Sequence, residues 1–247
     1  MTATAGLDRY FSSADGLRLH YRDYPAAAAG RVPVLCLPGL TRNYRDFESI
    51  ALRIQPARRV LSADLRGRGL SQRDPNWGNY HPGTCVGDIA RLLVDAGAPR
   101  VVILGTSLGG ILAMILAASM PQVLAGVTYG LAWPDARDED WLAFARRSYI
   151  EVDGVPRLDM DPMIGEAVRA APSGAAPDLW PVYAALRAIP TLALRGAISD
   201  VLSEATFDRM AREKPDLERV TVPGGHPPLL YEPASVAAID AFLARLD

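Results

Sequence analysis

The sequence is poor in lysine, and its basic residues are no more numerous than its acidic ones. Lys214 is the only lysine, and arginine supplies the rest of the 26 basic residues, against 28 aspartates and glutamates. The net charge is −2. Nucleic-acid-binding proteins depend on an excess of positive charge, so we expect no nucleic acid partner.

Cysteines and long apolar runs are also scarce. Two cysteines are too few for a disulfide framework, and Cys36 lies in the apolar run "VPVLCLP", which predicts a buried thiol. No segment provides the roughly 18 uncharged apolar residues of a membrane helix. The N-terminal "MTATAGLDRYFSSADG" lacks the charged and apolar regions of a secretory signal. We therefore expect a cytoplasmic protein without a membrane span.

Strand-like and helix-like patterns alternate along most of the 247 residues. An alternating, half-exposed strand over 15–25 should place Leu17, Leu19 and Tyr21 on one face and Arg18, His20 and Arg22 on the other. Predicted strands follow at 31–39, 58–69, 99–107, 124–134, 189–196 and 217–225, and predicted helices at 83–97, 108–121, 203–215 and 232–246. This order predicts an α/β fold, a mostly parallel doubly wound sheet with helices on both faces.

One region interrupts this alternation. Residues 133–188 contain no run typical of a buried strand, and they include the loop-like patch "APSGAAPD". We interpret 133–188 as a mostly helical insertion and residues 1–132 with 189–247 as the core. The larger apolar side chains of the insertion are candidate pocket walls: Trp133, Trp141, Phe144, Met160, Met163, Trp180 and Tyr183.

Ser107 is the candidate nucleophile. It lies in "VVILGTSLGG", a Gly-x-Ser-x-Gly sequence that follows a predicted strand and opens a predicted helix. Glycines at such a turn let neighbouring backbone pack closely, and the helix N-terminus offers unpaired N–H groups to a developing oxyanion. The alternative is a tight turn that needs only small residues.

A serine hydroxyl needs a base, and the chain has three histidines. His226 follows the last predicted strand in the loop "VPGGHPP", which makes it the best candidate. His20 lies on the polar face of the first strand, and His81 precedes a helix. Neither is favoured as the base, and His81 is better explained as a surface or edge residue.

The base needs a carboxylate, and the oxyanion needs two donors. Asp200 follows the sixth predicted strand, between Ser107 and His226 in the chain, and Asp135 is its rival. Asp200 could instead cap a helix, although Ser203 is the better cap. The expected oxyanion donors are the backbone N–H groups of Leu108 and of Leu40 in "LPGLTRN".

The sequence resembles the α/β-hydrolase superfamily over nearly its whole length. The matching segments are "LCLPGLTRNYRDFESIA", "RVLSADLRGRGLS", "VILGTSLGGILAMILAA", "LALRGAISDVLS" and "VPGGHPPLLYEP". In this resemblance, 133–188 corresponds to the cap that covers the pocket. "DLRGRGLS", with Asp64, Arg66, Gly67, Gly69 and Ser71, looks structural, its charges pairing with each other. Epoxide hydrolases and haloalkane dehalogenases of this fold have aspartate at the position of Ser107, which argues against both activities.

These observations predict a serine-dependent hydrolase of carboxylic esters that acts on a small to medium, largely apolar molecule. No cofactor is required, and no cluster has metal-ligand spacing. A C–C bond hydrolase, an enol-lactonase or another lactonase would use the same triad. Arg146 or Arg147 would favour those alternatives if either bound a substrate carboxylate, although solvated helix charge also explains them. An acyltransferase and a ligand receptor without turnover are further alternatives.

Overall fold

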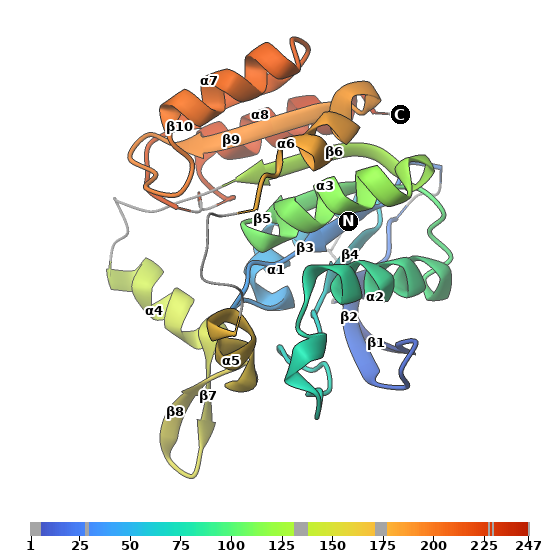
Figure 1. The fold of residues 1–247 in the computed structure, drawn as a ribbon, viewed down its shortest axis with the longest axis vertical. Coiled ribbons are helices and arrows are strands. Elements are labelled where there is room, and N and C mark those ends of the chain that lie inside the picture. Colours follow the sequence, from blue (N-terminus) through green and yellow to red (C-terminus); the bar gives the residue numbers. More distant parts are fainter. Residues whose placement is uncertain are drawn as a thin grey trace.

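The protein is built around one twisted sheet. The computed structural model describes residues 6–27, 30–130, 138–170, 177–226, 228 and 230–246. Among these residues, eight strands form the sheet in the order β1-β2-β4-β3-β5-β6-β9-β10 (Figure 1). The strands are β1 (Leu7–Ser12), β2 (Arg18–Tyr24), β3 (Val34–Leu37), β4 (Val60–Ala63), β5 (Val101–Thr106), β6 (Leu124–Gly130), β9 (Thr191–Gly196) and β10 (Glu218–Val222).

The sheet is parallel from β4 to β10, and only its β1 and β2 end is antiparallel. The core helices are α1 (Glu48–Ile54), α2 (Pro82–Asp95), α3 (Leu108–Ser119), α6 (Trp180–Ala184), α7 (Glu204–Glu213) and α8 (Pro233–Ala244). The predicted mostly parallel doubly wound sheet is confirmed. In a parallel sheet the carboxyl ends of the strands share one edge, so the loops after β3, β5, β9 and β10 meet there.

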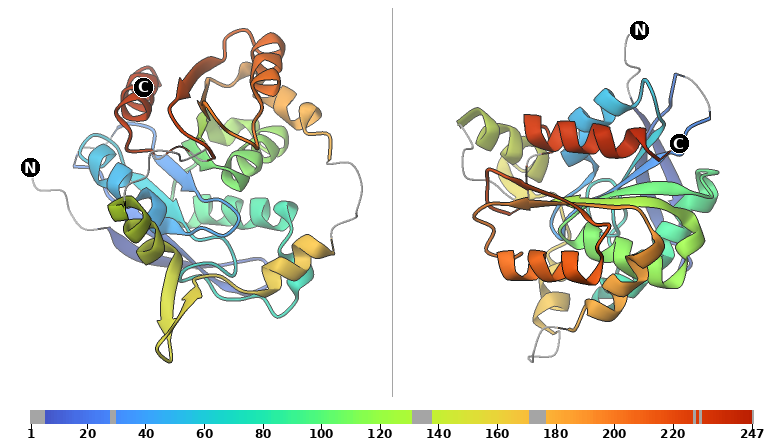
Figure 2. Two further views of the ribbon diagram at one scale, coloured as in Figure 1. Left: turned by 90° about the vertical axis from the view of Figure 1, so that its left-hand side faces the viewer. Right: turned by 90° about the horizontal axis from the view of Figure 1, so that it is seen from above.

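Each face of the sheet has its own apolar cluster, and strand β5 shows why. Its apolar residues are continuous, and alternate side chains point to opposite faces. Val101 and Ile103 pack in the cluster beneath α2, α3, α6 and α7, whereas Val102 and Leu104 pack in the cluster beneath α1 and α8. Figure 2 shows α1 and α8 on one side of the sheet and α3 and α7 on the other.

Three strands were missed by the sequence patterns. Strand β1 is mostly exposed and pairs with β2 at the edge, so it lacks the apolar alternation that marks a half-buried strand. Because β1 covers this edge, β2 is largely buried rather than half-exposed. The other omission is a two-stranded hairpin, β7 (Tyr149–Val152) and β8 (Val155–Leu158), within the region predicted to be mostly helical.

The region 133–188 contains two different parts. Helix α4 (Asp138–Ser148), the β7–β8 hairpin and α5 (Met163–Arg169) lie together to one side of the sheet (Figure 1). Helix α6 and the 3₁₀ turn Ala185–Ala188 instead pack against the core. Tyr183 and Leu186 are buried there, in the apolar cluster that Val101 and Ile103 also join. Residues 180–188 therefore contribute to the core although they fall inside the predicted cap.

Candidate active site

Ser107 occupies a strained turn between β5 and α3. Its φ of 51° and ψ of −116° are unusual for a residue with a side chain. The turn is held by close backbone packing, because a Cβ on Gly105 would lie 2.6 Å from the carbonyl carbon of Gly109. A Cβ on Gly109 would lie 2.0 Å from the carbonyl oxygen of Leu37. Only glycine fits at either position.

His226 lies beside this serine. Its Nε2 is 3.2 Å from the Oγ of Ser107, although 119 residues separate the two in the sequence. His226 follows β10 on a loop in which Gly224 has a φ of 136°. Burial lowers the pKa of His226 below its ordinary value of 6.5, and the negative charge of Asp200 acts in the opposite direction. Burial therefore favours the neutral ring that a general base requires.

Asp200 is close enough to influence this histidine, but it makes no hydrogen bond to it. Asp200 is exposed on the loop after β9. The Nδ1 of His226 is buried without a hydrogen-bond partner among the residues that the structure describes. Ser203, not Asp200, caps α7 by accepting a hydrogen bond from the N–H of Thr206. The rival carboxylate Asp135 lies outside the described residues.

The other two histidines have structural contacts elsewhere. His20 is fully buried, with Nδ1 2.7 Å from Asp64 and Nε2 3.0 Å from Asp8, so the expectation that it lies on an exposed polar face is wrong. The cause is β1, which covers the edge of β2. His81 is exposed and caps α2, accepting a hydrogen bond from the N–H of Gly83.

The loop after β3 passes close to Ser107. Leu37 pairs with Gly105, so the next residues of β3 and β5 leave the sheet side by side. A Cβ on Gly39 would lie 3.5 Å from the Cβ of Ser107. Leu40, the following residue, is the first candidate donor to an oxyanion. Leu108 is the second, because it is the first residue of α3 and its N–H has no acceptor within the helix.

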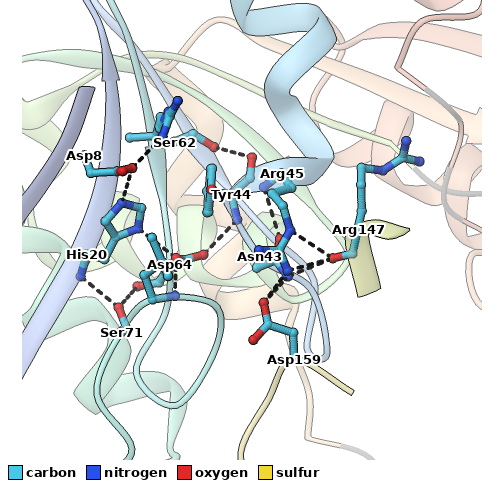
Figure 3. A network of polar contacts seen from close by, with 12 residues as sticks. Asp8, His20, Asn43, Tyr44, Arg45, Ser62, Asp64, Ser71, Arg147 and Asp159 are labelled. Atoms are coloured by element: carbon cyan, nitrogen blue, oxygen red, sulfur yellow. Dashed lines mark hydrogen bonds and ion pairs between the residues drawn. The ribbon is translucent and has the colours of Figure 1, made fainter. Parts of the chain in front are cut away.

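Residues of the "DLRGRGLS" segment hold the loop after β3 in place by hydrogen bonds, and Figure 3 shows the one between Asp64 and Tyr44. The carboxylate of Asp64 accepts hydrogen bonds from the N–H groups of Tyr44, at 2.8 Å, and Leu70, at 2.9 Å. The buried guanidinium of Arg68 donates to the carbonyl oxygen of Leu40 at 2.9 Å. Asp64 and Arg68 thus hold two points of the loop that runs beside Ser107.

The charges of this segment do not pair with each other, contrary to expectation. Asp64 faces His20, and Arg66 forms ion pairs with Asp88, Asp74 and Asp15. Burial opposes the charged form of Arg66, but the hydrogen bonds that it donates to its carboxylate partners raise its pKa. Asp15 and Asp88 come from distant parts of the chain, and only tertiary packing brings them to Arg66.

A second set of hydrogen bonds joins the loop after β3 to α4 (Figure 3). Buried Asn43 donates to the carbonyl oxygen of Arg147 at 3.0 Å, and Arg45 donates to the same oxygen at 3.2 Å. Arg45 also forms an ion pair with Asp159, which is buried. The end of α4 is therefore anchored to the loop beside Ser107. No sequence pattern predicted this anchor.

Two cavities meet at Ser107 and His226. The first, of about 450 Å³, extends along the loop after β3 and is lined by Leu40, Arg42, Asp46, Phe144, Arg147 and Tyr231, among others. The second, of about 640 Å³, extends along α3 and is lined mainly by apolar side chains, which include Ile111, Met114, Leu179, Trp180, Tyr183 and Leu202. Of the candidate pocket walls, Phe144, Trp180 and Tyr183 line these cavities, whereas Met160 and Met163 line neither of them.

The described residues contain neither a membrane-spanning helix nor a cluster of metal ligands. None of their helices has both the length and the apolar character needed to span a bilayer. Nor do His, Cys, Asp and Glu side chains in that part of the chain form a group of three that could ligate a metal.

Known proteins share this architecture. The model of the alpha/beta hydrolase family matches residues 34–239. The 3-hydroxybutyrate-oligomer hydrolase of Cupriavidus necator is 26% identical, over 91% of this chain and 92% of its own length. The 2-(acetamidomethylene)succinate hydrolase of Mesorhizobium japonicum is 28% identical, over 77% of this chain and 80% of its own.

A solved structure is more similar still. The crystal structure of an alpha/beta hydrolase from Novosphingobium aromaticivorans superimposes with a TM-score of 0.90 at 38% identity, covering 98% of this chain and 99% of that one. The family match extends from β3 to α8 and so includes Ser107, His226 and the loops that carry them. The chain belongs to the alpha/beta hydrolase family.

Proposed function

We propose that this hydrolase cleaves carboxylic esters through an acyl-enzyme on Ser107. The observation that carries the proposal is the 3.2 Å approach of His226 Nε2 to Ser107 Oγ at the junction of two cavities. A substrate whose carbonyl carbon lies at Ser107 could extend in both directions. The strained φ of Ser107 supports the same assignment, because strain of this kind accumulates at functional turns.

In the proposed mechanism His226 acts first as base and then as acid. Nε2 takes the proton of Ser107 as Oγ attacks the carbonyl carbon, and the oxyanion accepts hydrogen bonds from the N–H groups of Leu40 and Leu108. The tetrahedral intermediate collapses, and the leaving alcohol departs with the proton from Nε2. Water then attacks the acyl-enzyme by the same steps in reverse, and the carboxylate of Asp200 stabilises the imidazolium.

A lactone or a C–C bond next to a carbonyl group is the second candidate substrate. The observation that favours it is the position of Arg147, which lines the first cavity and could bind a substrate carboxylate. A relative named for an acetamidomethylene succinate and another named for 3-hydroxybutyrate oligomers show that the family hydrolyses chemically different molecules. The same serine and histidine would serve either reaction.

The decisive experiment removes the nucleophile. We expect Ser107→Ala to lower kcat for p-nitrophenyl butyrate by about 10³-fold or more with an unchanged melting temperature. A fluorophosphonate should label the wild-type protein at Ser107 and leave the variant unlabelled. Ser119→Ala is the matched control, because Ser119 is exposed at the other end of α3 and hydrogen-bonds within its own helix. Equal activity of Ser107→Ala and wild type would overturn the proposal.

Parallel assays identify the bond that is cleaved. Wild-type protein is assayed against esters of graded acyl length, lactones and vinylogous diketones. An ester hydrolase should give its highest kcat/KM with the esters, and this turnover should depend on Ser107. Preference for a lactone or a diketone would select the second candidate instead.

A further inference from the structure

The two cavities at Ser107 differ in charge. The lining of the first contains two guanidinium groups, Arg42 and Arg147, and one carboxylate, Asp46. His226 adds no charge when neutral, and burial favours that form. The charged groups that line this cavity therefore carry one excess positive charge. The second cavity is lined mainly by apolar groups, and the carboxylate among its lining residues is Asp178.

Arg42 and Asp46 form an ion pair with each other. Nε and Nη2 of Arg42 donate to the two carboxylate oxygens at 2.7 and 2.5 Å, a bidentate arrangement. Nη1 of Arg42 donates to the hydroxyl of Ser148, and the guanidinium lies 4.0 Å from the centre of the Phe144 ring. Arg42 is thus held in place, and its charge is balanced by Asp46.

Arg147 shares the carboxylate of Asp46 with Arg42, so that one positive charge of the pair remains in excess. Its Nε forms a longer ion pair with Asp46, at 3.5 Å, and has no hydrogen-bond partner in the part of the chain that the structure describes. Its side chain is only 24% exposed. Because the lining of this cavity has one positive charge in excess, a carboxylate that enters the cavity would form a charge-assisted hydrogen bond or an ion pair with the guanidinium of Arg147.

The backbone of Arg147 is fixed independently of its side chain. Its carbonyl oxygen accepts the hydrogen bonds from Asn43 and Arg45, whereas the guanidinium is directed away from that network (Figure 3). The anchor therefore holds the residue in position and leaves its charged group available to the cavity. Arg146, the neighbouring cation, is exposed and is absent from the lining of both cavities.

We infer that the substrate carries a carboxylate that Arg147 binds in the first cavity, while an apolar part of the same molecule occupies the second. The scissile carbonyl group lies between them, at Ser107 and His226. The inference rests on the proposed function for the position of that carbonyl. It narrows the substrate class to half-esters of dicarboxylic acids or to acyl esters of hydroxy acids, according to which side of the ester enters the first cavity.

The test compares each acid with its isosteric primary amide. For a carboxylate on the acyl side, the pair is p-nitrophenyl 5-carboxypentanoate and p-nitrophenyl 5-carbamoylpentanoate. For one on the alcohol side, it is 3-(butanoyloxy)butanoate and 3-(butanoyloxy)butanamide. The ratio of kcat/KM, acid to amide, is measured for wild type, Arg147→Gln and the matched control Arg146→Gln, after subtraction of spontaneous hydrolysis.

We expect wild type to prefer the acid in at least one pair and Arg147→Gln to lower that ratio by about 10- to 100-fold, the effect of losing a charge-assisted hydrogen bond. Arg146→Gln should keep the wild-type ratio. If Ser107 hydrolyses the ester bond of the amide-bearing compounds as fast as that of the acids in both pairs, the inference is overturned and the proposed function is left intact. A ratio that falls equally in both arginine variants would also overturn it, because it indicates a general field effect.

Measurements of ligand binding test the carboxylate site without depending on catalysis. Calorimetry measures the Kd of 3-(butanoyloxy)butanoate and of 5-carboxypentanoate for Ser107→Ala with and without Arg147→Gln. A Kd about 10-fold or more weaker without Arg147 supports the carboxylate site even if the wild-type protein hydrolyses no ester, in which case only the proposed function fails. Kd values that Arg147→Gln leaves unchanged for both acids would overturn the inference.

Discussion

The carboxylate of Asp200 acts on His226 through space, without a hydrogen bond to its ring. The negative charge raises the pKa of His226, whereas burial, the larger effect, lowers it. Nδ1 is buried and has no hydrogen-bond partner among the described residues. The ring is therefore positioned by its loop and by Ser107 rather than by a carboxylate at Nδ1.

The acid limb of the pH profile should lie below pH 6.5. His226 must be neutral to accept the proton of Ser107, and burial lowers its pKa from 6.5, so kcat/KM should persist as the pH falls to 6.5 and decline only below it. In Asp200→Asn the limb should move to still lower pH, because the charge that favours the imidazolium is gone. The measurement is kcat/KM for p-nitrophenyl butyrate between pH 4.5 and 8. A limb above pH 6.5 would contradict this account of His226.

Replacing Asp200 should also lower activity at a pH where His226 is neutral. We expect Asp200→Asn to lower kcat by about 10-fold at pH 8, because the imidazolium formed in the transition state loses a counter-charge that acts on it through space. Asp135→Asn is the control and should stay within a few-fold of wild type. If Asp135→Asn proved the more damaging change, the acid would belong after β6 instead of β9.

The close packing beneath the turn at Ser107 should be intolerant of a single methyl group. Gly109→Ala places a Cβ 2.0 Å from the carbonyl oxygen of Leu37, which belongs to the central strand β3 and cannot yield easily. We expect a loss of about 3 kcal/mol or more in the free energy of unfolding, measured by urea denaturation.

Gly87→Ala is the matched control for this substitution. Gly87 lies in α2, and a Cβ there would meet nothing within 4 Å. The change should stabilise the protein by about 0.5–1 kcal/mol, because alanine is the better helix former. Equal destabilisation by both substitutions would mean that the steric argument about Gly109 is wrong.

Asp64 should matter for both stability and activity. Asp64→Ala removes the partner of fully buried His20 and the acceptor of the Tyr44 N–H, which we expect to cost about 3–5 kcal/mol of unfolding free energy. The kcat should also fall, since the loop that carries Leu40 loses an anchor. Asp208→Ala, which breaks an exposed ion pair with Arg219, should cost less than about 1 kcal/mol and leave kcat unchanged. An Asp64→Ala protein as stable and active as wild type would refute this role.

The sequence patterns were sufficient where the structure depends on local periodicity. Continuous apolar runs predicted buried parallel strands such as β5, and the glycines around Ser107 predicted the strained turn. The β7–β8 hairpin was missed although its signal was present: Asp153 and Gly154 form the turn, both with positive φ, and an Asp-Gly pair is typical of such turns. Strand β1 has no comparable signal, since it is an exposed edge.

The sequence by itself therefore determined the family fold and the residue types capable of its chemistry. Tertiary structure alone decided which side chains lie together, because a contact between residues as far apart as Ser107 and His226 depends on how separate loops pack at one edge of the sheet. The same packing buried His20 against Asp64 and left Asp200 without a hydrogen bond to His226. It also directed Arg147, and not Arg146, into a cavity beside the serine.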